Sequence, residues 1–279
     1  MKKILLLLLL TPVLTFAQED LLSGLDSVPK NEITDSAFKA LKIVNLESTK
    51  LAAKKELYFI VAHRFGSVEG GFESFFGLDN AVTQIKFEYG LTQWLTLAAG
   101  RSEQAYDVSA KYRLWPQMKN GFPVSIVVFN SVAFNNLLKE NNLPKLEFSD
   151  RMSYVSQLLI SRKFSDRFSL ELAPSFLHEN FVSDDNQANS QFIMGMGGRL
   201  KVSKRVSINL DYAAHANRAS GSPYKNPLSV GVDIDTGGHV FQMHFTNSQG
   251  MHEAGFLGNT TGDWGEGDIY FGFNLSRVF

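Results

Sequence analysis

The chain ends with the stretch GDIYFGFNLSRVF, residues 267–279. Apolar side chains recur there at every second position, at Ile269, Phe271, Phe273 and Leu275, and the final residue is again Phe. A period of two is the pattern of a β-strand with one apolar and one polar face. The stretch therefore predicts a strand whose apolar face contacts either a protein core or lipid.

The same alternation recurs along the chain from about residue 55 onward, which predicts an all-β fold. Residues 206–212, for example, alternate between Val206, Ile208 and Leu210 on one face and Ser207, Asn209 and Asp211 on the other. We predict strands near residues 55–65, 81–92, 94–100, 105–115, 122–135, 153–164, 167–178, 188–202, 205–216, 227–236, 239–248 and 267–279.

The connections between these strands alternate in length. Short connections are predicted at residues 92–93, 165–166, 203–204 and 237–238, with a somewhat longer one at 115–121. Long connections are predicted at residues 66–80, 136–152, 179–187, 217–226 and 249–266. Outer-membrane β-barrels have tight periplasmic turns and long external loops, and a strand of about ten tilted residues crosses the membrane. Residues 55–279 are therefore predicted to form a closed antiparallel transmembrane β-barrel, an up-and-down meander of about 12 strands. Periodicity alone leaves a sandwich with a water-facing polar surface as the alternative.

The beginning of the chain has the features of a secretory signal peptide. Met1-Lys2-Lys3 is basic, an apolar run follows from Ile4 to Leu10, and small residues flank a site after Ala17. This pattern predicts export by the Sec pathway and cleavage near Ala17, followed by insertion into the outer membrane of a Gram-negative cell. An uncleaved anchor helix is the alternative. Because the sequence contains no Cys, neither a lipid-anchored N-terminus nor a disulfide is available.

Residues 18–54 fit the strand pattern poorly. We predict a periplasmic tail or a short plug for this segment, with an extra strand as a further alternative. A periplasmic partner that binds residues 18–54 is also possible on this interpretation.

Composition and motifs argue against several function classes. The formal net charge is -1, which gives no reason to expect nucleic acid as a partner. Neither a G-x-S-x-G nor an H-E-x-x-H motif occurs, and we expect no cofactor, no metal site and no catalytic residue. His239 and His244 are five residues apart on one strand, so they lie on opposite faces. An outer-membrane hydrolase would need a Ser or Asp side chain beside His244 or His215.

The polar face of the predicted strands carries charged residues that would line the lumen of the barrel. These candidates are Arg64, Lys86, Glu88, Asp107, Lys111, Arg113, Glu171, Arg199, Asp211, Asp233 and Asp235, together with His244. Positive residues concentrate in the earlier strands and acidic residues in the later ones. The two groups could face each other across a wet pore and set its charge preference, or they could pair and fill the lumen.

Several motifs in fixed order resemble a known family. They are HRFG (63–66), FFGLDNA (75–81), EYGLT (88–92), GRS (100–102) and YDVSAKYRL (106–114). This series is similar to a β-barrel family from Bacteroidetes, domain of unknown function 5777, best over residues 40–135 and by pattern to the end. The terminal Phe279 also resembles the signal that the barrel assembly machinery recognises, although Arg277 stands where that signal often has an aromatic residue. The resemblance implies an outer-membrane barrel that contacts the lipid bilayer and lipopolysaccharide, and it implies no substrate.

Two long connections and one glycine cluster are further candidates for a role. Residues 66–80 combine Gly with Phe72, Phe75 and Phe76, and could fold inward as a constriction or bind a partner. Residues 249–266 are Gly-rich and are interpreted as an ordinary surface loop, as the first connection also could be. The glycines of GMGGR, residues 195–199, are expected to ease a bend or to leave room in the lumen.

Together these patterns favour a porin-like channel or transport component for small polar solutes. Charge preference and pore width would then depend on Arg64, Lys86, Lys111 and Arg113 against Glu171, Asp233 and Asp235. The alternative is a non-conducting barrel that serves as a structural or partner-binding scaffold, which a lumen closed by salt bridges or by residues 18–54 would favour.

Overall fold

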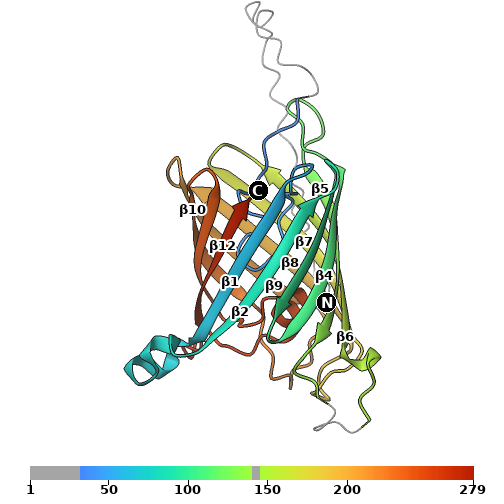
Figure 1. Cartoon of the computed structure of the whole chain (residues 1–279). Helices are drawn as coiled ribbons and strands as arrows, with labels where there is room; N and C mark the ends of the chain where they lie inside the picture. Colours follow the sequence, from blue (N-terminus) through green and yellow to red (C-terminus); the bar gives the residue numbers. More distant parts are fainter. Residues whose placement is uncertain (1–31, 140–144) are drawn as a thin grey trace, which may run out of the picture.

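The structure is a computed structural model that describes residues 32–139 and 145–279. It forms a closed barrel in which each of twelve antiparallel strands pairs with its neighbours in sequence, and β1 pairs with β12 (Figure 1). The predicted twelve-stranded meander is thereby confirmed. The predicted signal peptide and residues 18–31 lie outside the described residues.

The twelve strands have the following bounds. They are β1 (Leu57–Ser67), β2 (Ala81–Gly90), β3 (Leu95–Ser102), β4 (Ala105–Trp115), β5 (Ser125–Asn135), β6 (Met152–Lys163), β7 (Phe168–Glu179), β8 (Ser190–Lys201), β9 (Val206–His215), β10 (Leu228–Asp235), β11 (His239–Thr246) and β12 (Tyr270–Val278). Predicted and observed boundaries differ by only a few residues.

The two ends of the barrel differ in their connections. The turn end carries the short turns, the start of β1 and the end of β12, where Leu57 and Phe279 exchange backbone hydrogen bonds. The loop end carries the long connections, with one exception between β3 and β4, where only residues 103–104 separate the strands. The predicted alternation of long and short connections is therefore present, with the β3–β4 hairpin as its departure.

The outer surface of the wall is apolar and the inner surface is mostly polar. Phe87, Leu97 and Val108 face outward and are 48%, 42% and 57% exposed, whereas inward neighbours such as Lys86 and Asp107 are buried. A core-forming sandwich would bury the apolar face instead. This inside-out arrangement is the one that a lipid environment requires.

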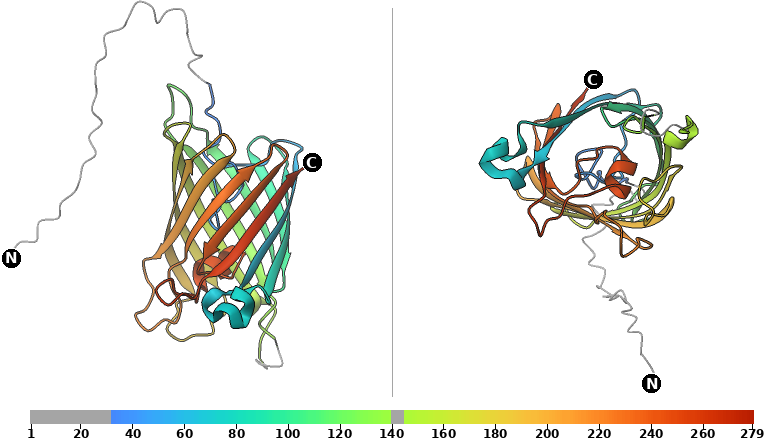
Figure 2. Two further views of the ribbon diagram at one scale, coloured as in Figure 1. Left: turned by 90° about the vertical axis from the view of Figure 1, so that its left-hand side faces the viewer. Right: turned by 90° about the horizontal axis from the view of Figure 1, so that it is seen from below.

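The segment before β1 enters the barrel from the turn end and folds back on itself inside (Figure 2). Ile33 forms an isolated bridge with Met118 at the turn end. Deeper in the lumen, the backbone N–H of Ile43 donates to the carbonyl of Leu46 at 2.8 Å, which closes a tight turn. We call residues 37–49 the lumen hairpin, with Val44 and Asn45 at its tip.

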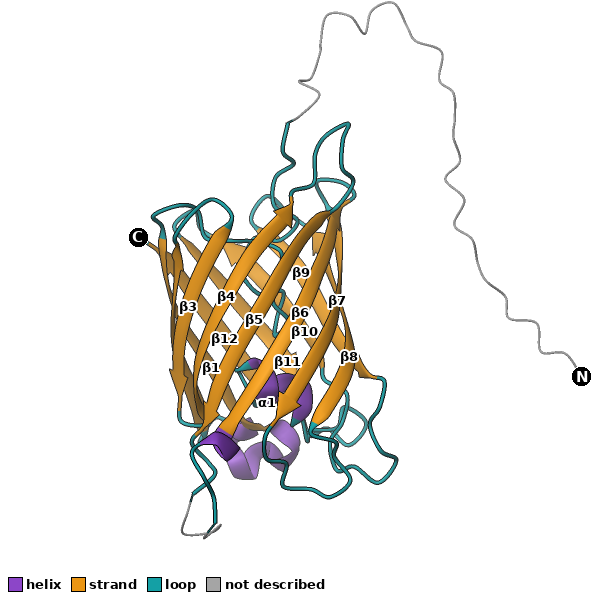
Figure 3. Cartoon of the chain, turned by 90° about the vertical axis from the view of Figure 1, so that its right-hand side faces the viewer, coloured by secondary structure: helices purple, strands orange, loops and turns teal. Residues whose placement is uncertain are grey.

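A second element enters the lumen from the loop end. The connection between β11 and β12 contains the short helix α1 (Glu253–Gly258), and all six of its residues are buried. The view along the barrel shows α1 and the lumen hairpin together inside the ring of strands (Figure 2), and α1 occupies the loop-end half (Figure 3). The expectation of an ordinary surface loop over residues 249–266 was therefore wrong for its central part, because Phe256 and Leu257 bury their side chains inside the barrel.

The connection between β1 and β2 lies outside the wall. It forms η1 (Val68–Gly77), a stretch of 3-10 turns that projects from the loop end (Figures 1 and 2). Phe72 is 86% exposed there. The inward constriction that we considered for this connection is thus not formed.

A further short element, η2 (Ser149–Arg151), precedes β6. Among the described residues, no helix has the length and apolar character to cross a membrane.

Candidate functional site: the plugged lumen

The acidic side of the barrel wall holds the tip of the lumen hairpin. One carboxylate oxygen of Asp211, on β9, accepts hydrogen bonds from the backbone N–H groups of Val44, Asn45 and Leu46, at 3.0, 2.7 and 2.9 Å. Successive backbone N–H groups at a tight turn form a concavity that favours an anion. Asp211 is fully buried, so these three donors replace the water that its charge would otherwise require.

Side chains from three other strands hold Asn45 at the tip. Its amide nitrogen donates to the hydroxyls of Ser229 and Thr246, both at 3.0 Å. Its amide oxygen accepts from the guanidinium of Arg64 at 2.7 Å. Every polar atom of this side chain therefore has a partner on the wall, which fixes the position of the tip within the lumen.

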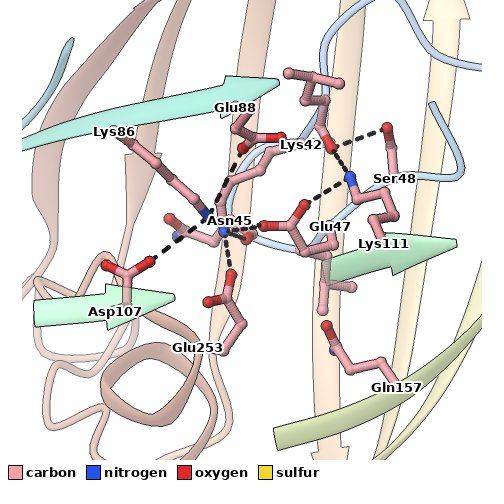
Figure 4. A network of polar contacts seen from close by, with 12 residues as sticks. Lys42, Asn45, Glu47, Ser48, Lys86, Glu88, Asp107, Lys111, Gln157 and Glu253 are labelled. Atoms are coloured by element: carbon pink, nitrogen blue, oxygen red, sulfur yellow. Dashed lines mark hydrogen bonds and ion pairs between the residues drawn. The ribbon is translucent and has the colours of Figure 1, made fainter. Parts of the chain in front are cut away.

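The basic side of the wall holds a carboxylate of the hairpin. Glu47 lies 2.8 Å from the ammonium of Lys111 on β4 and 3.6 Å from that of Lys86 on β2 (Figure 4). It also pairs with Lys42 of the same hairpin at 2.9 Å. All three lysines approach one carboxylate that is 1% exposed, so the pairs are shielded from solvent and from screening by salt.

An ion pair joins the lumen hairpin to α1. The ammonium of Lys42 lies 2.5 Å from a carboxylate oxygen of Glu253, the first residue of α1 (Figure 4). The two elements enter from opposite ends of the barrel and meet at this contact. Because Lys42 binds both Glu47 and Glu253, movement of either element breaks a buried contact of the other.

The ionisation of these three groups is set by their surroundings. Burial alone would raise the pKa of Glu47, but the ammonium groups of Lys111, Lys42 and Lys86 outweigh it and hold the pKa well below its usual range. Burial opposes the charge of Lys42, yet the carboxylates of Glu253 and Glu47 raise its pKa. Burial raises the pKa of Glu253 despite its lysine neighbours. Glu47 is thus the firmly charged centre of the network.

The second half of the hairpin also contacts the wall. The backbone N–H of Thr49 donates to Glu171 on β7 at 2.9 Å, and its hydroxyl lies 2.5 Å from that of Ser161 on β6. Lys111 donates to the carbonyls of Leu41 and Lys50 at 3.0 and 3.3 Å. The wall therefore contacts the hairpin along its whole length.

An apolar patch on the inner wall covers the other side of the hairpin. Phe38, Ile43 and Leu46 pack in one buried cluster with inward-facing Leu177 and Ile193. The same cluster includes Ala37, Val155, Ala213, Ala254, Phe256 and Leu257. The hairpin and α1 thus share one small apolar core inside a largely polar lumen.

Glycines on the inner wall leave room for the hairpin. A Cβ at Gly197 would lie 2.2 Å from Cδ1 of Ile43, and one at Gly195 would lie 3.2 Å from Cδ1 of Leu46. A side chain at Gly197 would therefore require the hairpin to shift, and one at Gly195 would crowd both Leu46 and Ala173 of the wall. Within the GMGGR motif, Gly195 and Gly197 thus make space for the hairpin.

The structure places all the predicted lumen residues on the inner face of the wall, but it does not leave them facing open water. Arg64, Lys86, Lys111, Glu171 and Asp211 contact the hairpin directly. Glu88 and Asp107 lie 3.7 and 3.8 Å from the ammonium of Lys86.

The remaining charged candidates lie around the same site. Arg199 donates to the carbonyl of Ala37 at 3.3 Å, and Asp235 pairs with Lys39 at 2.9 Å. Asp233 accepts from Gln242 at 2.9 Å, and Gln242 in turn donates to the carbonyl of Ile43 at 3.0 Å. Arg113 is half-buried on the inner face near the turn end. The basic and acidic walls are therefore bridged by the hairpin and do not face each other across water.

His215 and His244 are the two histidines that a hydrolase site was expected to use. Within the described ranges, the ring of His215 contacts the carbonyl of Leu257 at 2.6 Å and Arg218 at 2.7 Å. Neither ring nitrogen of His244 has a hydrogen-bond partner there. The described part of the chain likewise holds no cluster of three or more His, Asp or Glu side chains arranged to bind a metal. Among the contacts of the described residues, neither His215 nor His244 thus pairs with a Ser or Asp side chain.

Sequence reasoning missed the residues that close the lumen, namely Lys42, Asn45, Glu47 and Glu253. The sequence did contain one indication that the lumen is filled, in the strand residues that face it. Leu177 follows Ser175 in the polar phase of β7, and Ile193 occupies the same phase on β8. Apolar residues on the wet face of a barrel indicate that something inside covers them.

Replacing Asp211 with Asn should loosen the lumen hairpin. Asn keeps the size but loses the charge that accepts three N–H groups, so we expect the closed arrangement to weaken by about 2 kcal/mol. The probe is an Ala40→Cys thiol, buried at 5% exposure in a chain without other Cys, whose rate of alkylation reports hairpin release. The rate should rise ~30-fold.

Asp235→Asn is the matched control for that change. Its carboxylate also faces a lysine of the N-terminal segment, but the side chain of that partner, Lys39, is 49% exposed. Exposed pairs contribute ~0–1 kcal/mol, so the alkylation rate should change little. Equal effects of the two substitutions would mean that the three backbone hydrogen bonds to Asp211 do not hold the hairpin.

A comparison with protein-family models agrees with this architecture. The family model described as a membrane-bound beta barrel domain, domain of unknown function 5777, matches residues 38–279. A comparison with curated proteins found no significant match.

Among solved structures, the KdgM porin is 10% identical, with 80% of this chain and 99% of that chain covered and a TM-score of 0.49. The NanC porin is also 10% identical, with 80% and 98% covered and a TM-score of 0.49. The outer membrane protein Omp33 of Acinetobacter baumannii is 10% identical, with 81% and 99% covered and a TM-score of 0.41. At such identities these proteins say nothing about a solute for this chain.

The match to the family model begins at Phe38, so it includes the lumen hairpin from its second residue as well as all twelve strands. The predicted family is thereby confirmed, while an origin in Bacteroidetes stays a prediction. This chain belongs to the family of membrane-bound β-barrel domains designated domain of unknown function 5777.

Proposed function

We propose that the protein is an outer-membrane channel for small polar solutes, and that the lumen hairpin and α1 hold it closed at rest. The turn end would face the periplasm and the loop end the outside, as in other barrels of this architecture. The observation that carries the proposal is the paired contact of Lys42 with Glu47 and Glu253, which joins the two inserts in the lumen. Opening would require this contact to break.

The character of the wall behind the hairpin supports a passage. Gln84, Gln157 and Asn209 face the lumen and are buried, alongside the charged residues described above. A wall of amide, hydroxyl and charged groups would fill with water once the hairpin left, because these groups need hydrogen-bond partners. The charged lumen residues would then tune which solutes pass.

A cavity at the loop end supports access from outside. It has a volume of about 340 Å³ and is lined by residues that include Glu179, Tyr224 and His252. Helix α1 contributes Ala254 and Gly255 to its lining. A solute that enters this vestibule would meet the element that latches the hairpin.

A second function has a specific observation in its favour. The apolar cluster of Phe38, Ile43 and Leu46 against Leu177 and Ile193 would have to be exposed to water when the hairpin left. That cost favours a permanently plugged barrel that acts as a structural or partner-binding scaffold.

Conductance in a planar bilayer separates the two functions. The refolded full-length protein, with folding verified by heat-modifiable gel mobility, is measured in KCl of increasing concentration and under increasing voltage. Brief openings with a defined unit conductance and a charge preference are expected of the closed channel. A folded barrel that stays silent under all conditions, and after release of the hairpin as well, would favour the scaffold.

A further inference from the structure

The connection η1 carries a concentrated group of exposed aromatic side chains. Phe72, Phe75 and Phe76 are 86%, 57% and 42% exposed, within a stretch of ten residues. Phe72 and Phe76 contact each other edge to face, with ring centroids 4.8 Å apart. The position of η1 beside the aromatic residues of the wall and the conformation of its backbone both bear on the surroundings of these rings.

The base of η1 is closed, which makes the segment project outward from the wall. The N–H of Gly66 donates to the carbonyl of Asn80 at 2.9 Å, so the two ends of the connection lie together. Gly77 has a φ of +81°, and a Cβ there would lie 2.2 Å from the carbonyl oxygen of Gly66. The N–H of Val68 donates to the carbonyl of Ile269 at 2.9 Å, which ties η1 to the start of β12.

η1 continues the lipid-facing aromatic surface of the wall. Phe65 on β1 and Phe271 on β12 face outward just beside it, with ring centroids 5.7 Å apart. Phe271 in turn contacts Phe245 on β11 at 5.5 Å, and Phe65 contacts Phe273 at 6.2 Å. These four residues form the loop-end aromatic belt of the barrel, where a membrane protein meets the lipid headgroups.

The backbone of η1 is held in an unfavourable conformation that exposes the rings. Phe75 and Phe76 have φ values of 47° and 55°, in the left-handed region that bulky residues rarely adopt. Such strain persists only where the surrounding structure holds it. The N–H of Leu78 donates to the carbonyl of Phe75 at 3.1 Å and that of Gly77 to the hydroxyl of Ser74 at 3.3 Å, so the turn is held while both rings stay exposed.

From these observations we propose that η1 is a membrane-surface anchor, with Phe72, Phe75 and Phe76 inserted among the acyl chains of the adjacent leaflet. Glu69 and Glu73, the two charged residues of η1, are both acidic and exposed. Attachment to an anionic lipid surface by charge is therefore unavailable, and the contact rests on apolar burial. The anchor extends the aromatic belt beyond β1 and β12.

Nitroxide labels on single cysteines test this anchor, because the chain has no Cys of its own. Phe72→Cys and Phe76→Cys are labelled in the full-length protein in phosphatidylcholine vesicles, and collisions with oxygen and with a water-soluble nickel chelate are measured. Val108→Cys, on the outward face of β4 and 57% exposed, is the lipid reference. Ser220→Cys, exposed in the connection between β9 and β10, is the water reference.

Labels at positions 72 and 76 should resemble position 108, with high oxygen access and nickel access several-fold below that of position 220. Nickel access equal to that at position 220 would overturn the anchor. Spin–spin broadening between copies would also overturn it, because the aromatic group would then bind a second barrel. If the change at Phe76 prevents folding, Phe72 decides alone, since its 86% exposed side chain supports little within the protein.

Discussion

Deleting residues 37–49 from the full-length chain should convert a barrel that passes almost no current into a steady pore, with mean conductance raised about tenfold or more. The deletion removes the element that Asp211, Glu171 and Lys111 hold in the lumen. It also removes Lys42 and with it the ion pair that retains α1 at Glu253. The measurement is single-channel recording of the refolded protein in planar bilayers.

A chain that also lacks Glu253–Gly258 is the fully open reference for that experiment. If α1 alone still closes the loop-end half, only this doubly shortened chain will conduct, and the difference assigns part of the closure to α1. Silence of both shortened chains, with folded barrels verified by heat-modifiable mobility, would contradict a passage through the lumen.

A reversible lock provides the matched control within the intact chain. The hydroxyl oxygens of Thr49 and Ser161 are 2.5 Å apart, so Thr49→Cys with Ser161→Cys brings two thiols to disulfide distance in a chain without other Cys. The oxidised protein should never open, and reduction should restore the openings of the unmodified protein. Openings of equal frequency in both states would show that the hairpin does not move when current flows.

The barrel was predictable from sequence because its signal is local and repeated. Each strand shows its two faces through a period of two, and each connection shows its length, so twelve weak signals agree. The terminal stretch at residues 267–279 is one such strand, and its outward residues Phe271 and Phe273 belong to the loop-end aromatic belt. Register and closure follow once the outward face is known.

A short plug was among the alternatives for residues 18–54, but the contacts that close the lumen were not predictable in the same way, because they join distant residues. The backbone of Asn45 binds Asp211, and the ammonium of Lys42 binds Glu253, across 166 and 211 positions of the chain. No period in the sequence encodes such contacts. The uneven distribution of charge over the wall was visible in the sequence. In the structure, however, both sides bind one hairpin: the positive side binds Glu47, and Asp211 on the negative side binds the N–H groups of the hairpin tip.

Replacing Glu47 with Gln should release the lumen hairpin more strongly than any other single change at the site. The carboxylate is the closest acidic partner of Lys111, at 2.8 Å, and it also pairs with Lys42 and Lys86. Removing one partner of a buried pair leaves the other charge uncompensated, which costs ~3 kcal/mol or more. Alkylation of the Ala40→Cys thiol should accelerate ~10²-fold, and channel openings should become frequent.

Glu32→Gln is the control of identical chemistry in the same N-terminal segment. Glu32 pairs with Lys119 at 3.0 Å, but both side chains are about half exposed, so the change should cost ~0–1 kcal/mol.

The double variant Glu47→Gln with Lys111→Gln tests the cause, because it removes the stranded ammonium together with its partner. Its alkylation rate should fall back toward that of the unmodified protein. If the double variant releases the hairpin as readily as Glu47→Gln alone, the release arises from the lost pairs with Lys42 and Lys86, and the stranded ammonium of Lys111 is not its cause.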